Sequence, residues 1–293
     1  MADVTAAMVK DLRERTGAGM MECKKALVEA NGDMSVAEDI IAKSGHKKAA
    51  KSSSRTAAEG RIVIAGDAQS AIVLEVNCET DFVGKDESFV KFCQQVADKA
   101  LSEKCNDIDK LNATILDANQ TVEDVRKALI VRLGENIQVR RIANVNANAN
   151  EKIGSYVHNG RIGTLVLISG GNDALAKDIA MHVAAMRPQF MKLEDVPQEI
   201  VAKEKEIMTE RAKQSGKPDN ILEKIVQGML QKHFAEVCLS GQPFFKDPDQ
   251  TVGALLKSNN ANLLQMIRLE VGEGIEVTKK SFEEEVALAR GSN

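Results

Sequence analysis

Apolar residues recur at helical spacing over the first 45 residues of the chain. Val4, Met8 and Leu12 lie four positions apart, which places them on one side of a first helix. The pair Gly17 and Gly19 then interrupts the pattern, and two further apolar runs follow within residues 20–45. The pattern predicts an N-terminal bundle of three short helices over residues 1–45.

Residues 46–56 (HKKAAKSSSRT) are basic, small and polar. This composition predicts a flexible linker. A basic clamp for an acidic partner is the alternative.

Beyond the linker the period of the apolar positions becomes that of strands. Residues 61–64 and 71–76 predict a hairpin, and a helix with its apolar face on residues 89–101 follows. A second helix over residues 121–133 and a strand over residues 137–139 complete a core subdomain over residues 57–148.

The same order of elements then recurs, so the chain contains an internal repeat. Residues 153–157 and 164–168 predict another hairpin, and residues 175–186 match the register of the helix at 89–100. A shared Gly-Glu-x-Ile-x-Val aligns residues 263–277 with 125–139. The repeat predicts an α+β core of two similar subdomains, residues 57–148 and residues 149–187 together with 238–278.

The offsets between the two copies show where they differ. The strands align at an offset of 92 residues (Val76 with Ile168), and the helices align at 87 (Val96 with Val183). The first copy therefore holds five extra residues after its second strand. The Gly-Glu alignment has an offset of 138, which predicts 51 extra residues in the second copy.

The larger insertion lies at residues 188–237. It contains two helical runs, residues 197–214 and 220–237, around the turn sequence Ser-Gly-Lys-Pro. These runs predict a protruding antiparallel coiled-coil hairpin, either a solvated arm or an arm for self-association or partner contact. A C-terminal helical module is predicted over residues 279–293.

The smaller insertion falls on the segment Glu79–Gly84, where Phe82 stands beside Asp81. A phenylalanine is ordinarily a core residue. The second copy builds the same fold without this segment, however, and a residue that the fold does not need is better explained by outward presentation.

Composition narrows the classes of function. The net charge of -4 and the absence of tryptophan argue against nucleic acid as the main ligand, because such binding depends on neutralised phosphates and stacked bases. The chain has no apolar run long enough to cross a membrane. The five cysteines and four histidines are scattered, and the usual catalytic motifs are missing. We therefore expect a cytoplasmic protein that has no cofactor or metal, is not an enzyme and acts on another protein.

Several segments, in order along the whole chain, resemble the signatures of the elongation factor Ts family. They are residues 12–27 (LRERTGAGMMECKKAL), 77–83 (NCETDFV), 180–185 (AMHVAA), 215–218 (SGKP) and 271–276 (VGEGIE). Glu22 stands where the family usually has Asp, a conservative change. The resemblance implies a bacterial-type, long-form factor for protein biosynthesis that exchanges nucleotide on the GTPase elongation factor Tu. It also implies an N-terminal bundle like a ubiquitin-associated domain.

The resemblance also implies roles for individual residues. Thr80, Asp81, Phe82 and Val83 match the segment associated with displacing Mg²⁺ from the GTPase. Leu12, Met20 and Met21 resemble the surface of the N-terminal module that contacts the GTPase, although the methionines also suit a core. His182 resembles a position that faces the partner.

Two other classes of function stay open from the residues alone. The first is an adaptor that binds a GTPase or another protein without releasing nucleotide. The second is an enzyme with a diffuse site, for which the sequence shows no set of converging titratable groups. The basic residues at 46–56 leave RNA binding as a weaker third.

Overall fold

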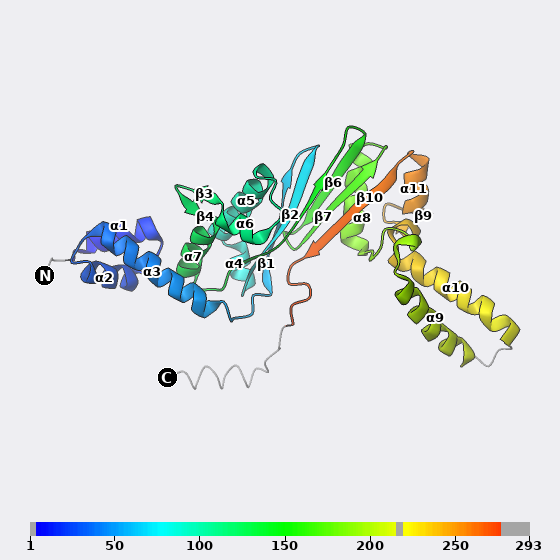
Figure 1. Cartoon of the computed structure of the whole chain (residues 1–293), viewed down its shortest axis with the longest axis horizontal. Helices are drawn as coiled ribbons and strands as arrows, with labels where there is room; N and C mark the ends of the chain where they lie inside the picture. Colours follow the sequence, from blue (N-terminus) through cyan, green and yellow to red (C-terminus); the bar gives the residue numbers. More distant parts are fainter. Residues whose placement is uncertain (1–3, 215–218, 277–293) are drawn as a thin grey trace.

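The computed structural model describes residues 4–214 and 219–276, which form an elongated molecule of helices and sheets. In Figure 1 a helical bundle lies at the N-terminal end, two sheets lie in the middle, and a pair of helices projects at the other end. The predicted C-terminal module at 279–293 and the Ser-Gly-Lys-Pro turn at 215–218 lie outside the described residues.

The N-terminal bundle consists of α1 (Ala6–Thr16), α2 (Met20–Glu29) and α3 (Met34–Ser52). Thr5 and Asp33 cap α1 and α3 by accepting backbone N–H groups, and Gly17 ends α1 in the left-handed conformation at φ 67°. The side chains that face inward form a core of their own: Val9, Leu12, Ala18, Cys23, Ala26, Leu27, Ala30, Ala37 and Ile41.

The flexible linker predicted at residues 46–56 is wrong over most of its length, because α3 continues to Ser52. Ile41, Ala49 and Ser52 are buried at helical spacing, and Gly45 faces Val131 of a helix in the first half of the core. Packing along that helix extends α3 by two turns, and Lys51 lies on its exposed side. The basic and polar composition of this segment therefore obscured its buried positions in the sequence pattern.

The first half of the core runs from residue 59 to residue 146. It contains β1 (Glu59–Gly66), β2 (Ser70–Cys78), α4 (Asp81–Lys85), α5 (Glu87–Ser102), α6 (Ile108–Ala113), β3 (Ile115–Asp117), β4 (Gln120–Thr121), α7 (Val122–Leu133) and β5 (Gln138–Asn146). The antiparallel sheet has the order β1-β2-β5, and α5 packs on one face of it. Six side chains of α5 are buried: Phe89, Phe92, Cys93, Val96, Ala97 and Ala100.

The second half runs from residue 151 to residue 270. It contains β6 (Glu151–His158), β7 (Ile162–Ser169), α8 (Asp173–Met186), η1 (Leu193–Asp195), α9 (Gln198–Lys213), α10 (Asp219–Val237), η2 (Leu239–Gly241), β8 (Pro243–Phe244), β9 (Asp247–Thr251), α11 (Val252–Ser258) and β10 (Asn262–Glu270). Its sheet has the order β10-β7-β6, with α8 against β6 and β7.

The two sheets pack face to face and share one apolar layer. From the first half this layer takes Ile62, Val73 and Val145, and from the second half Leu165, Leu167 and Leu269. Gly163 allows the closest approach, because a Cβ atom there would lie 2.3 Å from the Cγ2 atom of Ile62. Each sheet therefore has its own helix on one face and the other sheet on the opposite face.

The repeat is present, but its last part was aligned wrongly. Residues 125–133 are helical, whereas residues 263–270 form β10. The strand equivalent to β5 is β10. Val139, which pairs with Val76, is equivalent to Leu263, which pairs with Ile168, and each pairing has its register shift next to this position. The shared Gly-Glu-x-Ile-x-Val therefore leads into β5 in one half and follows β10 in the other.

A hexapeptide that begins both α7 and α11 gives the correct alignment. Asp-x-x-Gln-Thr-Val occurs at residues 117–122 and 247–252, and Thr121 and Thr251 cap their helices in the same way. The offset between the copies is 87 residues at the earlier helices and 130 residues at this hexapeptide. The second copy therefore has 43 extra residues between α8 and α11, and not 51.

Most of those extra residues form α9 and α10, which pack against each other. Met208, Ala212 and Val226 are buried between them, while Ile200, near the start of α9, is 40% exposed. The pair projects from the end of the molecule in Figure 1. None of the described helices is long and apolar enough to cross a bilayer.

Two glycines provide a test of the packing in the second half. A Cβ atom at Gly154 would lie 2.0 Å from the carbonyl oxygen of Ala176 in α8, whereas one at Gly228 of α10 would meet no atom within 4 Å. Gly154→Ala is expected to lower the free energy of unfolding by about 1–3 kcal/mol through overpacking. Gly228→Ala is expected to raise it by roughly 1 kcal/mol through helix propensity. Equal effects in urea unfolding would contradict this packing.

Candidate functional site

The five residues of α4 are the surplus that distinguishes the first half from the second. In the second half β7 leads directly through Gly170 and Gly171 into α8, with no helix between. In the first half α4 lies between β2 and α5 and contacts β1. Gly84 makes this contact possible, since a Cβ atom there would lie 3.2 Å from the carbonyl oxygen of Gly60.

The turn of α4 divides the candidate residues into an inner and an outer set. Thr80 is the N-cap and accepts from the backbone N–H of Val83 at 3.4 Å, and Val83 is buried against the core. Asp81 and Phe82 point outward, and the Phe82 side chain is 81% exposed. Phe82 therefore does not lie in the core. The comparison of the two copies predicted this outward position.

Asp81 carries its charge on the same exposed face. Its carboxylate accepts from Lys85 Nζ at 2.6 Å, and this hydrogen bond, with a smaller contribution from the charge of Arg161, lowers the pKa of Asp81. The site thus presents a large apolar side chain beside an ionised carboxylate.

Beneath α4, Cys78 closes the turn from the inside. Burial, reinforced by Glu135 and Glu59, raises the pKa of its thiol to about 12. The thiol therefore stays protonated and donates to the carbonyl oxygen of Thr80 at 3.1 Å.

A glutamate that sequence reasoning missed holds the other side of the turn. Glu135 Oε2 accepts from the backbone N–H groups of Glu79 and Thr80, each at 3.0 Å. Its Oε1 accepts from the hydroxyl of Thr80 at 2.6 Å. The Gly-Glu-Asn sequence at residues 134–136 stands out only for its repeated Gly-Glu, and no local pattern indicates a contact with Glu79 and Thr80.

Met20 and Met21 form a second exposed apolar group. They are 60% and 66% exposed on α2, near the exposed side chain of Val28 and the basic residues Lys24 and Lys25. Figure 1 places α2 at the N-terminal end and α4 beside β1, so the two groups are separate surfaces.

Two of the predicted partner contacts need correction. Leu12 is fully buried in the core of the N-terminal bundle, because it lies on the inward stripe of α1. His182 is fully buried on the inner face of α8. Neither side chain is at the surface of this structure, so each contributes to packing instead.

His182 is held as a neutral imidazole by its partners. Its Nδ1 accepts from the backbone N–H of Phe245 at 3.3 Å, which leaves the proton on Nε2 for donation to Gln242 Oε1 at 2.9 Å. Burial lowers the pKa of His182, and the hydrogen bond that its Nε2 donates to Gln242 acts in the opposite direction. The ring lies 6.0 Å from each of the rings of Phe244 and Phe245, so it positions the turn between β8 and β9.

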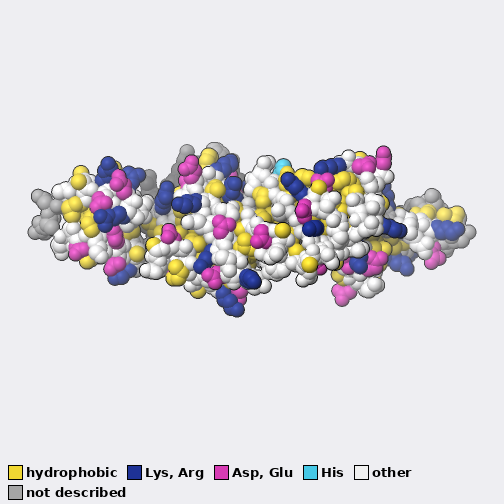
Figure 2. Space-filling view, turned by 90° about the horizontal axis from the view of Figure 1, so that it is seen from above, with side chains coloured by type: hydrophobic (Ala, Val, Ile, Leu, Met, Phe, Trp, Pro, Cys, Tyr) yellow, Lys and Arg dark blue, Asp and Glu magenta, His cyan; other side chains and the backbone are white. Residues whose placement is uncertain are grey.

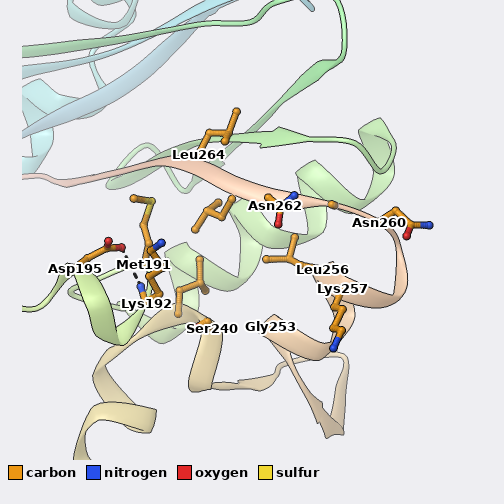
Figure 3. A pocket seen from close by; sticks show the side chains of 13 residues that line it. Met191, Lys192, Asp195, Ser240, Gly253, Leu256, Lys257, Asn260, Asn262 and Leu264 are labelled. Carbon is orange, nitrogen blue, oxygen red and sulfur yellow. Dashed lines mark hydrogen bonds between the residues drawn. The ribbon is translucent and has the colours of Figure 1, made fainter.

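The rest of the described surface carries mixed side chains. On the face shown in Figure 2, basic and acidic side chains are interspersed along the molecule instead of forming one basic patch. The hollow in Figure 3 lies between α11, β10 and the segment around η1, and its lining is mixed, with Met191 and Leu256 beside Asp195 and Lys257. Among residues 4–214 and 219–276 no group of three His, Cys, Asp or Glu side chains is arranged to hold a metal.

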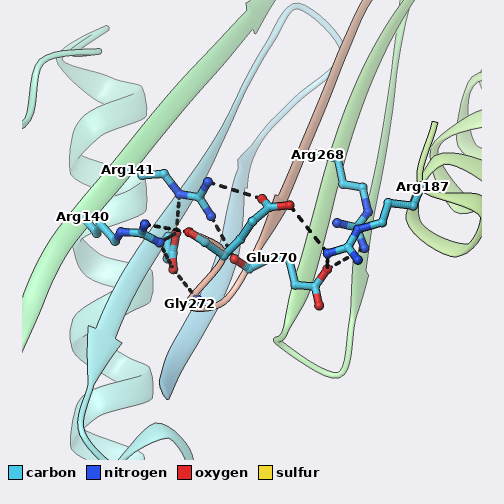
Figure 4. Close-up of polar contacts among 8 residues, drawn as sticks. Arg140, Arg141, Arg187, Arg268, Glu270 and Gly272 are labelled. Carbon is cyan, nitrogen blue, oxygen red and sulfur yellow. Dashed lines mark hydrogen bonds and ion pairs between the residues drawn. The ribbon is translucent and has the colours of Figure 1, made fainter. Parts of the chain in front are cut away.

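A cluster of ion pairs lies where the two halves meet (Figure 4). Glu75 is fully buried and accepts from Arg140, Arg141 and the backbone N–H of Gly272. Arg141 also donates to the carbonyl oxygen of Glu270 at 2.8 Å. These bonds connect β2 and β5 to the segment that follows β10, so we assign them a structural role.

Comparison with known proteins agrees with the geometry. Residues 79–273 match the family model described as Elongation factor TS. The chain is 52% identical over 292 residues to the elongation factor Ts of Thioalkalivibrio sulfidiphilus, covering 99% of both chains. It is 51% identical over 285 residues to that of Methylococcus capsulatus, covering 97% of both chains. The one from Idiomarina loihiensis is 49% identical over 283 residues, covering 97% of this chain and 96% of its own.

These matches define a translation elongation factor. The chain belongs to the elongation factor Ts family.

The environment of His182 predicts a pH dependence of stability. The unfolded imidazole titrates near ~6.5, and burial places the folded pKa lower. The unfolded state therefore binds more protons as the pH falls below about 6.5, and stability is lost by up to ~1.4 kcal/mol per pH unit until the folded group is protonated too. Urea unfolding at several pH values between 7.5 and 5 measures this loss.

His182→Asn is expected to reduce that pH dependence, although it lowers stability at every pH. His158 lies exposed on β6 and serves as the matched control. His158→Asn should leave the pH dependence of unfolding unchanged. A wild-type slope in the His182→Asn variant would show that His182 is not the titrating group.

Proposed function

We propose that this chain promotes the release of GDP from elongation factor Tu, displacing Mg²⁺ through the Asp81–Phe82 segment and allowing GTP to rebind. The observation that carries the proposal is Phe82, an 81% exposed aromatic side chain on a helix that the repeated fold does not need. The name shared by the relatives supports a role in elongation, and we infer that the protein acts in the cytoplasm.

The proposed mechanism requires no covalent chemistry. A GTPase holds GDP through backbone N–H groups, a lysine and Mg²⁺ on the phosphates. A factor that binds best when this site is distorted must weaken nucleotide binding by the same free energy by which nucleotide weakens the factor. Phe82 supplies apolar area for a wedge, and Asp81 supplies a carboxylate that disturbs the coordination of the metal.

The exposed methionines of α2 supply a second contact in this proposal. Met20 and Met21 have flexible, polarisable side chains that adapt to an apolar partner surface. We assign them to affinity, and Phe82 and Asp81 to release. This division separates the exchange factor from a pure adaptor, which would bind the GTPase without accelerating release.

Phe82→Ala tests the wedge. Because the side chain is exposed, the free energy of unfolding should fall by less than about 1 kcal/mol. The rate of release of a fluorescent GDP from elongation factor Tu, followed by stopped flow, should fall by an order of magnitude or more. The reason is that the variant lacks a contact made only when the nucleotide site is distorted.

Phe89→Ala provides the contrast, since Phe89 is fully buried in α5. It should lower the free energy of unfolding by about 3–5 kcal/mol. The proposed function fails if Phe82→Ala leaves release unchanged per folded molecule. Binding of the wild-type chain without faster release would favour the adaptor.

Asp81→Asn tests the carboxylate, with Lys85→Gln as the matched control. Both variants remove the same ion pair in α4, but only the first removes the negative charge. Asp81→Asn should slow release in the presence of Mg²⁺ and have a smaller effect after chelation, while Lys85→Gln should leave the rate close to wild type. Equal slowing by both would mean that the ion pair, and not the charge, is what matters.

A further inference from the structure

The presentation of Phe82 raises a mechanical question, because α4 is too short to hold itself in place. A helix of five residues is far below the length at which an isolated helix becomes stable in water. Its own cap is weak, since the bond from the N–H of Val83 to the hydroxyl of Thr80 is long at 3.4 Å. Contacts from elsewhere must therefore fix the direction in which Phe82 points.

Glu135 supplies those contacts from the loop between α7 and β5. Its carboxylate accepts three hydrogen bonds, and all of them come from Glu79 and Thr80, the two residues that precede α4. Hydrogen bonds to an ionised acceptor are stronger than neutral ones. Glu135 thus fixes the backbone of the turn from which α4 starts.

The attachment is reciprocal. Glu79 Oε1 accepts from the backbone N–H of Asn136 at 2.5 Å and pairs with Arg55 Nε at 3.2 Å. The Arg55 side chain in turn donates to the carbonyl oxygen of Gly134 at 3.0 Å, and the backbone carbonyl oxygen of Arg55 accepts from Asn136 Nδ2 at 2.8 Å. Three segments that are far apart in the sequence therefore form one closed network.

Comparison of the two halves indicates that this network accompanies α4. Val139 and Leu263 are equivalent, so the residue equivalent to Glu135 is Asn259, four positions before the strand residue in each case. The Asn259 side chain donates to the carbonyl oxygen of Leu255 and to the hydroxyl of Ser258, at the end of α11, and not to the turn at Gly170 and Gly171. Where α4 is missing, so is the bridging carboxylate.

We propose that Glu135 is a positioning residue for nucleotide exchange, which acts by holding the turn at Glu79 and Thr80 so that α4 directs Phe82 and Asp81 toward the partner. This inference rests on the proposed function. Glu135 itself contacts the two residues before α4 and acts through them. Its loss should therefore affect the rate of release at saturating factor more than the concentration of factor at half-saturation.

The test measures GDP release from elongation factor Tu over a range of factor concentrations, with Glu135→Ala and Glu135→Gln in the full chain. A displacement of about 1 Å in a positioned group can lower a rate by up to ~100-fold, so Glu135→Ala should lower the maximal rate by about tenfold. Glu135→Gln retains one acceptor oxygen and should lie between Glu135→Ala and wild type. Circular dichroism gives the folded fraction, and Glu135→Gln decides the question if the alanine variant does not fold.

A double-mutant cycle distinguishes positioning from a separate contact. If Glu135 acts through Phe82, adding Glu135→Ala to Phe82→Ala should slow release little beyond Phe82→Ala alone. Glu273→Ala is the matched control, because Glu273 follows a glycine in the second half and contacts Arg141 and Arg187 instead of α4. It should leave the maximal rate per folded molecule unchanged.

The outcomes separate this inference from the function beneath it. Unchanged release in Phe82→Ala would overturn the proposed function. Slowed release in Phe82→Ala together with wild-type release in both Glu135 variants would leave that function standing and overturn the positioning role. Fully additive effects in the double mutant, or equal slowing by Glu273→Ala, would also overturn it.

Discussion

The packing of one three-stranded sheet against the other is the interaction on which the rest of the structure depends. β2 is buried along nearly its whole length, because α5 covers one face of its sheet and the second half covers the other. Each sheet has a helix on its other face, but the apolar layer between the sheets is buried only when the two halves are in contact. Burial of this layer is favourable in proportion to the apolar area removed from water, so it stabilises the frame to which α4 is attached.

The polar seam determines how the halves are joined. A buried carboxylate such as Glu75 is tolerated only because two arginines and the N–H of Gly272 satisfy it, and removing one member of such a group typically destabilises by about 3–5 kcal/mol. Apolar contacts are not directional, whereas these hydrogen bonds and ion pairs require one alignment of the two halves. The segment after β10 is thereby attached to β2 and β5, as Figure 4 shows.

The periodic parts of this fold could be predicted from the sequence, and the parts that depend on tertiary partners could not. Both hairpins, α5 and α8 followed from apolar spacing, and the offset between the copies located the five residues of α4 and the outward Phe82. The extension of α3 was missed because its apolar stripe exists only against α7. The Gly-Glu alignment was wrong because four identical residues were given more weight than the order of the elements.

The candidate site, too, could be predicted from the sequence only in part. Local sequence indicated Asp81 and Phe82, yet His182 and Leu12 were expected at the surface although neighbouring elements cover them. Glu135 lies 55 residues from Thr80, and no periodicity connects them. Such long-range polar contacts depend on which loops the fold brings together.

The elements that the two halves share contribute to stability, and the elements that they do not share carry the proposed function. What the halves share, namely the sheet, the helix on its face and the capped helix that begins at the Asp-x-x-Gln-Thr-Val segment, is built around a buried apolar core in each half. What they do not share, α4 in one and α9 with α10 in the other, adds little to the common core and lies at the surface. An exposed element of this kind can bind a partner without unfolding the frame, provided that something holds it. For α4 that support comes from charged groups on two other segments, Glu135 and Arg55. The position of Phe82 and Asp81 therefore depends on contacts that a helix of five residues cannot supply by itself.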